Sequence, residues 1–232
     1  ALIKRPGLIT PSRDERCMQV ACTAKLNSGC ISRQVGAAVA DENGFVRAIG
    51  WNDAPRGQTP CLLKKCFEFV KKQDRNSYSK YEFETERFAE CVKEFYCIVR
   101  DESEARGVSP CFCFKDIKNI IDREKNQVYT RSLHAEENAF LALVNGSGCN
   151  IRGGTLYTTA SPCVLCAKKA YQLGVRRVVY VEPYPDISFE HVFESGLERP
   201  VPVLYSGALG AAYHKLYQPI VPLKDELSAL SI

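Results

Sequence analysis

The sequence predicts an α/β protein in which a mixed sheet of about five strands lies between two layers of helices, a three-layer α/β/α fold. Two observations carry this prediction. Short apolar runs and amphipathic segments alternate over residues 134–217, which favours strands connected by helices and parallel neighbours in that half. Two apolar runs nearer the amino end are joined by Glu42-Asn43-Gly44, which is typical of an antiparallel hairpin.

The individual elements follow from local patterns. A first helix is expected over 14–28, because apolar residues recur at helical spacing and Gly29 follows. Glycine also closes the helices expected at 163–173 and 188–196. The other expected elements are the helices 134–144 and 211–217 and the strands 34–41, 45–51, 153–159, 175–182 and 201–206.

The amino-acid composition of the chain changes between residues 55 and 130. This segment is rich in Lys, Glu, Arg, Phe and Tyr and contains six of the 12 cysteines. Within it, KYEFETERFAECVKEFYCIV (80–99) favours a helix. We therefore expect one domain over 1–232 with an insertion at about 55–130.

Bulk composition excludes several classes of protein. The 232 residues are 45% hydrophobic and 25% charged, which suits a sizeable core and argues against disorder. A net charge of +4 suits a small anionic ligand and is too weak to indicate nucleic acid by itself. There is no signal peptide and no apolar run long enough to cross a membrane, so we expect a cytoplasmic protein with reduced thiols.

Two short motifs carry the chemistry. His134 and Glu136 stand at the start of one expected helix, and a Pro-Cys163-x-x-Cys166 sequence opens the next. One imidazole and two thiolates make three zinc ligands, and catalytic zinc sites keep a fourth position for water. Zinc lowers the pKa of that water to about 7, and Glu136 is expected to move its proton. Either motif alone is typical of chance or of a structural metal site, but together they are the signature of zinc-dependent nucleobase deaminases.

The chain resembles the deoxycytidylate (dCMP) deaminases of the cytidine deaminase superfamily. The matching stretches are CISRQVGAAVAD (30–41), GWND (50–53), HAEENAF (134–140) and LYTTASPCVLCAKKA (156–170). The resemblance implies a cytidine deaminase-like fold and zinc-dependent, hydrolytic deamination of dCMP, dCTP or both.

The tail VEPYPDISF…YSGALGAAYHKLY is similar to longer bacterial members of that family. Some of these carry a P-loop domain ahead of the deaminase and deplete deoxycytidine nucleotides during phage infection. This chain has no P-loop motif, so we expect that an amino-terminal P-loop domain is missing from it.

The resemblance also implies roles for single residues. Zinc-activated water attacks C4 of cytosine, while Glu136 protonates N3 and then the leaving amine, so that ammonia departs. The backbone N–H of Ala135 would hold the ring carbonyl, Asn52 the sugar hydroxyl, and Arg33 or Arg131 the phosphate. The alternatives are a plain turn asparagine and solvated surface arginines. A homo-oligomer and a dCTP or dTTP effector are further expectations from the family.

A second, structural zinc is also expected from the resemblance. Relatives use a cysteine where Cys30 stands and another near Cys61, together with histidines ahead of the catalytic one. This chain has no histidine there, so Cys111 and Cys113 are the expected replacements. The alternative is that these four residues are free thiols.

The sequence leaves two other function classes open. A deaminase of single-stranded DNA or tRNA would need a basic channel with stacking aromatics. The segment 61–75 is basic and partly aromatic, but the acidic YEFETERFAE (81–90) follows it. A zinc-bearing scaffold without activity would not need Glu136, so this glutamate argues against it.

Overall fold

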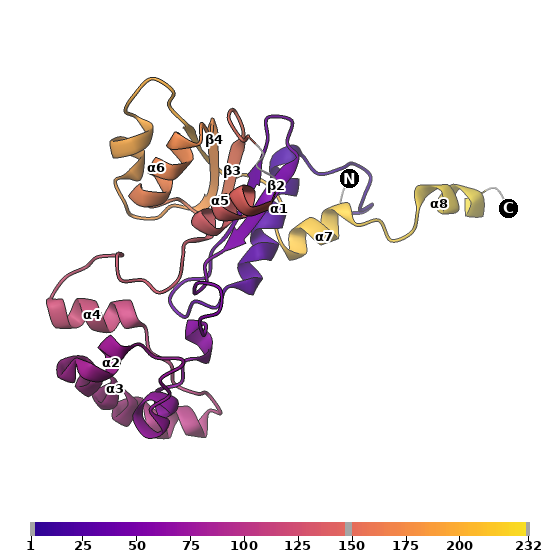
Figure 1. The fold of residues 1–232 in the computed structure, drawn as a ribbon. Coiled ribbons are helices and arrows are strands. Elements are labelled where there is room, and N and C mark those ends of the chain that lie inside the picture. Colours follow the sequence, from indigo (N-terminus) through magenta and orange to yellow (C-terminus); the bar gives the residue numbers. More distant parts are fainter. Residues whose placement is uncertain (1–2, 147–149, 231–232) are drawn as a thin grey trace. The chain divides into compact units, whose positions relative to one another are not determined.

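The computed structural model describes residues 3–146 and 150–230. Its sheet has five strands in the order β2-β1-β3-β4-β5 (Figure 1). β1 pairs antiparallel with β2 and β3, whereas the pairs β3–β4 and β4–β5 are parallel, which confirms the predicted mixed sheet and hairpin. The strands are β1 (Gly36–Ala40), β2 (Val46–Trp51), β3 (Thr155–Ala160), β4 (Arg177–Glu182) and β5 (Val201–Leu204).

The helices lie close to the predicted positions in the second half of the chain. Within the described residues, no helix is both long and apolar enough to cross a bilayer. The α-helices are α1 (Arg13–Ala24), α2 (Lys80–Glu84), α3 (Glu86–Ala105), α4 (Phe114–Asp122), α5 (Ala135–Gly146), α6 (Val164–Gln172), α7 (Ala211–Tyr217) and α8 (Leu223–Leu230). Short 3-10 or π turns are η1 (Lys25–Asn27), η2 (Cys61–Leu63), η3 (Glu68–Lys72) and η4 (Phe189–Phe193).

The chain divides into two compact units. The sheet unit comprises residues 1–27, 35–51 and 135–232, and the helical unit comprises 28–34 and 52–134. The expected insertion at 55–130 lies inside the helical unit, which also takes in the loop 28–34.

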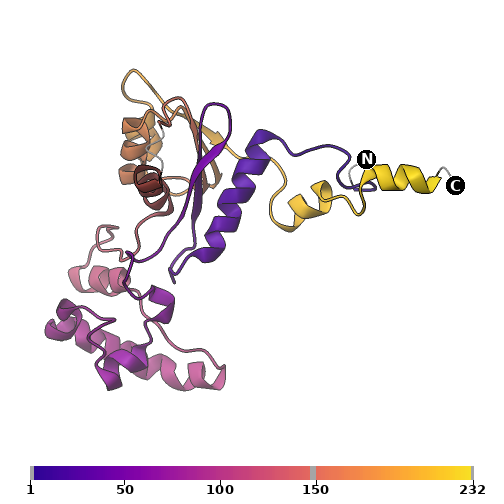
Figure 2. The same ribbon diagram turned by 45° about the vertical axis from the view of Figure 1, so that its right-hand side comes forward.

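In the sheet unit, helices cover both faces of the sheet, as the three-layer prediction requires. Figure 2 shows α1 on one face and α5 and α6 on the other. Because side chains alternate along a strand, Val39 and Leu156 pack in the core on the α5 and α6 side, whereas Ala38 and Tyr157 pack with α1. Strands β1 and β3 are therefore buried at every position.

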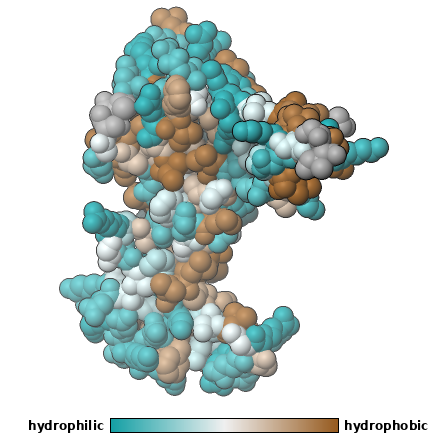
Figure 3. All heavy atoms as spheres, turned by 90° about the vertical axis from the view of Figure 1, so that its right-hand side faces the viewer, coloured by the Kyte–Doolittle hydropathy of each residue, from teal (hydrophilic) through white to brown (hydrophobic). Residues whose placement is uncertain are grey.

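The carboxyl-terminal segment is tied to α1. Ser12 and Glu15 form a capping box at the start of that helix. Glu15 Oε1 also accepts hydrogen bonds from the Tyr217 hydroxyl at 2.6 Å and the Ala208 N–H at 3.0 Å. Beyond this contact, apolar side chains of α8 such as Leu227 are exposed, and the end of the chain shows apolar surface in Figure 3.

The helical unit has a core of its own, built largely from aromatic side chains. Phe69 stacks on Phe83 with ring centroids 4.6 Å apart, and Phe88 lies 4.9 Å from Phe114. The buried residues of this aromatic core are Cys66, Phe69, Tyr78, Phe88, Val92, Tyr96, Phe112 and Ile117.

The single helix predicted over 80–99 is wrong, because the structure has two helices there. Thr85 adopts an extended backbone with φ −83° and ψ 97°. Its N–H donates to the Tyr81 carbonyl and ends α2, while its own carbonyl accepts from the Ala89 N–H and begins α3. Helices α4 and α8 were not predicted from the sequence.

Candidate active site

His134 and Glu136 lie at the start of helix α5, which packs on the sheet. His134 is the residue immediately before α5, and Glu136 lies in its first turn with 4% of its surface exposed. The helix approaches β2 closely at Gly50, where an added Cβ would lie 2.3 Å from the Ala135 carbonyl oxygen. The Asn138 side-chain amide also donates to the Trp51 carbonyl at 2.7 Å. Helix α5 is therefore held in place by backbone contact with β2.

The two cysteines lie just after the end of strand β3, at the start of α6. Cys163 is the N-cap of α6, and Cys166 is buried in its first turn. The Val164 N–H donates to Asp186 Oδ2 at 2.9 Å, which satisfies one of the open amide groups at the helix start. Lys169 of α6 forms an ion pair with Glu137 of α5, so the two helices are linked beside the cysteines.

The three predicted zinc ligands come together. The ligand atoms of His134, Cys163 and Cys166 all lie within 4.8 Å of one another, and no other such metal-binding group occurs among the described residues. One imidazole and two thiols form a donor set that zinc prefers, with a fourth position left for water.

The electrostatics of this group favour a cation. A hydrogen bond with Cys163 raises the pKa of the Cys166 thiol, and burial and the Glu136 carboxylate raise it further. A divalent ion would reverse this effect, since it stabilises the thiolates it binds. The residues present therefore fit zinc, with a buried carboxylate close by.

The predicted substrate residues lie in different settings. Asn52 is buried, and its side chain accepts from the Ser28 hydroxyl at 2.8 Å and donates to the Arg33 carbonyl at 2.6 Å. The side chain of Arg33 is exposed. Ala135 is the first residue of α5, where the backbone N–H has no partner within the helix. Arg131, the other residue expected at the phosphate, has a side chain that is 11% exposed and paired with Glu82. The roles of these residues in binding substrate stay predictions.

The four thiols predicted for a second zinc all lie in the helical unit. Cys61 is buried, the Cys111 thiol donates to the Leu62 carbonyl at 3.4 Å, and burial raises the pKa of Cys113 to about 11. Cys30 is partly exposed. These cysteines are not part of a three-ligand group in the part of the chain that the structure describes, and the second zinc stays a prediction.

Sequence reasoning missed two contributors to the site. Asp186 supports the start of α6 from a loop 22 residues further on, and the Glu137–Lys169 pair joins the two helices. The Pro-Asp pair in YPDIS favours a turn, and this local signal could have pointed to a loop at Asp186. No local pattern indicated the ion pair, because its partners lie on separate helices.

Comparisons with known proteins agree with this arrangement. The model of the cytidine and deoxycytidylate deaminase zinc-binding region matches residues 11–182. The deoxycytidylate deaminase of Enterobacteria phage T2 is 29% identical over 170 residues, which cover 72% of this chain and 78% of that protein. The deoxycytidylate deaminase of Schizosaccharomyces pombe is 29% identical over 179 residues, which cover 77% of this chain and 40% of that protein.

A solved structure shows the same fold. The dCMP deaminase from the cyanophage S-TIM5, in complex with dCMP and dUMP, is 22% identical with a TM-score of 0.50. The match covers 85% of this chain and 99% of that one.

Proposed function

Since the chain belongs to the cytidine and deoxycytidylate deaminase family, we propose that it hydrolyses the amino group of deoxycytidylate to give deoxyuridylate and ammonia. The observation that carries this proposal is the His134, Cys163 and Cys166 group with the buried Glu136 beside it. Relatives over most of the chain are deoxycytidylate deaminases, which supports the choice of substrate.

The site residues divide the chemistry among them. His134, Cys163 and Cys166 would hold zinc, which when bound supplies a polarised water at neutral pH. Glu136 takes a proton from this water and delivers it to N3 of the cytosine ring. As N3 is protonated, the water oxygen bonds to C4. Glu136 then carries the proton of the new C4 hydroxyl to the amine, so the C4–N bond breaks, a C4 carbonyl forms and ammonia departs. Burial of Glu136 keeps these transfers away from bulk water.

Substrate recognition is proposed for three further groups. The open N–H of Ala135 donates to the ring carbonyl, Asn52 contacts the sugar hydroxyl, and Arg33 pairs with the phosphate. Both polar groups of the Asn52 amide already take part in hydrogen bonds with the loop 28–34, so this residue also shapes the loop that carries Arg33.

Several finer properties are part of the proposal. Turnover of dCTP, a nucleotide effector, a homo-oligomer and a structural zinc at Cys30, Cys61, Cys111 and Cys113 follow from the family resemblance. A role in phage defence follows from the tail alone. Metal analysis tests the second zinc directly, since a ratio of one zinc per chain would exclude it.

The test of the function is uracil formation from dCMP, dCTP, cytidine and a cytosine-containing single-stranded oligonucleotide. Glu136→Gln should lose at least about 100-fold in turnover while it keeps its zinc. Glu190→Gln, which changes an exposed glutamate, should keep both. Turnover of the oligonucleotide alone would overturn the proposal, and so would full activity of Glu136→Gln.

A further inference from the structure

The helical unit contains a pocket of about 550 Å³ that the proposed reaction does not use. All of its lining residues belong to the segments 58–82 and 114–131. Four of them are cationic, namely Lys64, Arg75, Lys80 and Arg131, and Glu82 is the only acidic one. The lining therefore carries a clear excess of positive charge.

Two of the four cations, Lys64 and Arg131, are buried together with the acidic Glu82. Lys64 is 5% exposed, Glu82 is 1% exposed, and the Arg131 side chain is 11% exposed. The lining thus holds two buried cations and one buried carboxylate, and a second carboxylate, Asp74, acts on Lys64 from outside the lining. A buried charge without a partner is costly, so this arrangement favours a further anion.

The carboxylate of the lining, Glu82, already accepts hydrogen bonds on both of its oxygens. Glu82 Oε1 accepts from Arg131, and Glu82 Oε2 accepts from the Ser79 N–H at 2.7 Å and the Ser79 hydroxyl at 2.8 Å. Glu82 therefore has little capacity left for a further cation, and the carboxylate that acts on Lys64 is Asp74, which does not line the pocket.

Arg131 is held firmly but keeps an open donor. Its guanidinium lies over the rings of Phe112 and Phe114, 5.5 and 5.1 Å from their centroids. Its Nη1 is buried without a hydrogen-bond acceptor in the part of the chain that the structure describes. The thiol of Cys61 lies nearby, and a thiol is a weak acceptor.

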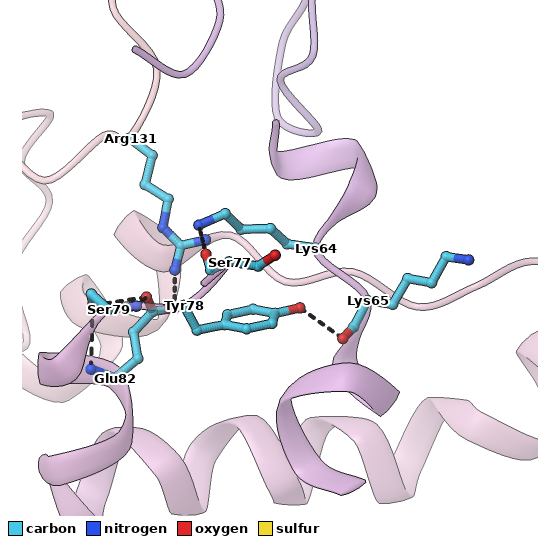
Figure 4. Close-up of polar contacts among 7 residues, drawn as sticks. All are labelled: Lys64, Lys65, Ser77, Tyr78, Ser79, Glu82 and Arg131. Carbon is cyan, nitrogen blue, oxygen red and sulfur yellow. Dashed lines mark hydrogen bonds and ion pairs between the residues drawn. The ribbon is translucent and has the colours of Figure 1, made fainter. Parts of the chain in front are cut away.

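Lys64 faces this arginine. Figure 4 shows the Lys64 ammonium and the Arg131 guanidinium turned toward one another. The ammonium donates to the Ser77 carbonyl, which leaves two of its three protons for other acceptors. Burial and repulsion by Arg131 lower the pKa of Lys64 to about 8. An anion between the two head groups would remove this repulsion.

The chemistry of these donors indicates which anion fits. A planar guanidinium edge and a point-like ammonium suit the tetrahedral oxygens of a phosphate group. Thr59, Ser77 and Thr130, which carry hydroxyls, also line the pocket. The volume lies in the range of small-molecule sites and exceeds what a single phosphate fills. Tyr129 and Phe114 supply apolar lining for the rest of a ligand.

We propose that this pocket binds the phosphate group of a small phosphorylated molecule, held by Arg131 and Lys64. The site lies within the helical unit, and its occupancy does not depend on the proposed deamination.

The test is titration calorimetry on the zinc-loaded chain with inorganic phosphate, pyrophosphate and ribose 5-phosphate. Saturable binding is expected for at least one probe, and Lys64→Gln and Arg75→Gln should each weaken it at least about tenfold. Tighter binding of ribose 5-phosphate than of inorganic phosphate would support a phosphate ester, and the reverse would overturn the phosphorylated molecule in favour of free phosphate. Lys71→Gln removes an exposed cation of the same unit outside the pocket and should leave binding unchanged.

Arg131 needs a paired variant, because Arg131→Gln alone leaves the buried Glu82 without its partner. The double variant Arg131→Gln/Glu82→Gln removes both charges, and it should fold and lose phosphate binding. Absence of saturable binding by the folded wild-type chain would refute the proposal. Binding that survives in Lys64→Gln but disappears in Arg33→Gln would also refute it, since the phosphate would then lie at the proposed substrate position.

Discussion

Substitution of Gly50 by alanine tests how the sheet positions the active site. Gly50 lies in β2 under the first turns of α5, and an added Cβ would be 2.3 Å from the Ala135 carbonyl oxygen and 2.4 Å from the Ala139 nitrogen. Ordinary contacts of this kind are about 3.5 Å, so the helix has to move by about 1 Å. Both contacting atoms are backbone, and no side-chain rotation relieves the clash.

Two effects are expected from this displacement. Overpacking of a closely packed core costs about 1–3 kcal/mol of unfolding free energy. A misplacement of about 1 Å in positioned catalytic groups can cost about 100-fold in rate, and His134 and Glu136 both lie at the start of α5. We therefore expect a much larger loss of dCMP turnover than the loss of stability alone explains, together with weaker zinc retention.

The assays are turnover with dCMP, zinc content and thermal unfolding. The matched control is Gly146→Ala at the far end of the same helix, where an added Cβ meets no atom within 4 Å. That variant should keep its activity and be neutral or slightly stabilised. If Gly50→Ala retains wild-type turnover and melting temperature, the close approach of α5 to β2 does not position the site.

Two further predictions concern stability. Phe88→Ala should cost about 3–5 kcal/mol, because Phe88 is 0% exposed in the aromatic core, whereas Phe95→Ala on the same helix removes a ring that is 37% exposed and should cost far less. Equal losses in denaturant unfolding would contradict this. Burial opposes ionisation of Glu15, but hydrogen bonds from the Tyr217 hydroxyl and from backbone N–H groups outweigh it and hold its pKa at about 2, against an ordinary value of 4.5. A lowered carboxyl pKa stabilises the fold above pH 4.5 and this stabilisation is lost as the pH falls to about 2, so the stability difference between wild type and Glu15→Gln should shrink over that window. A difference that stays constant across it would contradict the prediction.

Local patterns in the sequence determined most of the elements of the sheet unit. The hairpin of β1 and β2 follows from a turn signal between two apolar runs, and the helices around His134 and Cys163 follow from apolar periodicity. The Cys163-x-x-Cys166 spacing predicts two thiols on one helical turn, because residues three apart lie on the same side of a helix. For these features the information lies within a few neighbouring residues.

The helical unit was predicted less well. Its break at Thr85 depends on one extended residue between two segments that are both good helix formers. Its core is an aromatic cluster drawn from 66–117, where aromatic residues show no single period. Local periodicity cannot distinguish one long helix from two when the break is set by packing against such a cluster.

The tertiary structure alone decided which distant side chains meet. It placed His134 within reach of two cysteines about 30 residues further along the chain, and it set Asp186 against the start of α6. It also buried Lys64 and Arg131 in one pocket lining, with Arg131 paired to the buried Glu82, although each is an ordinary surface residue by type. The physical reason is that strand register and helix docking determine these contacts, and both depend on the burial of the whole core, which no short stretch of sequence contains.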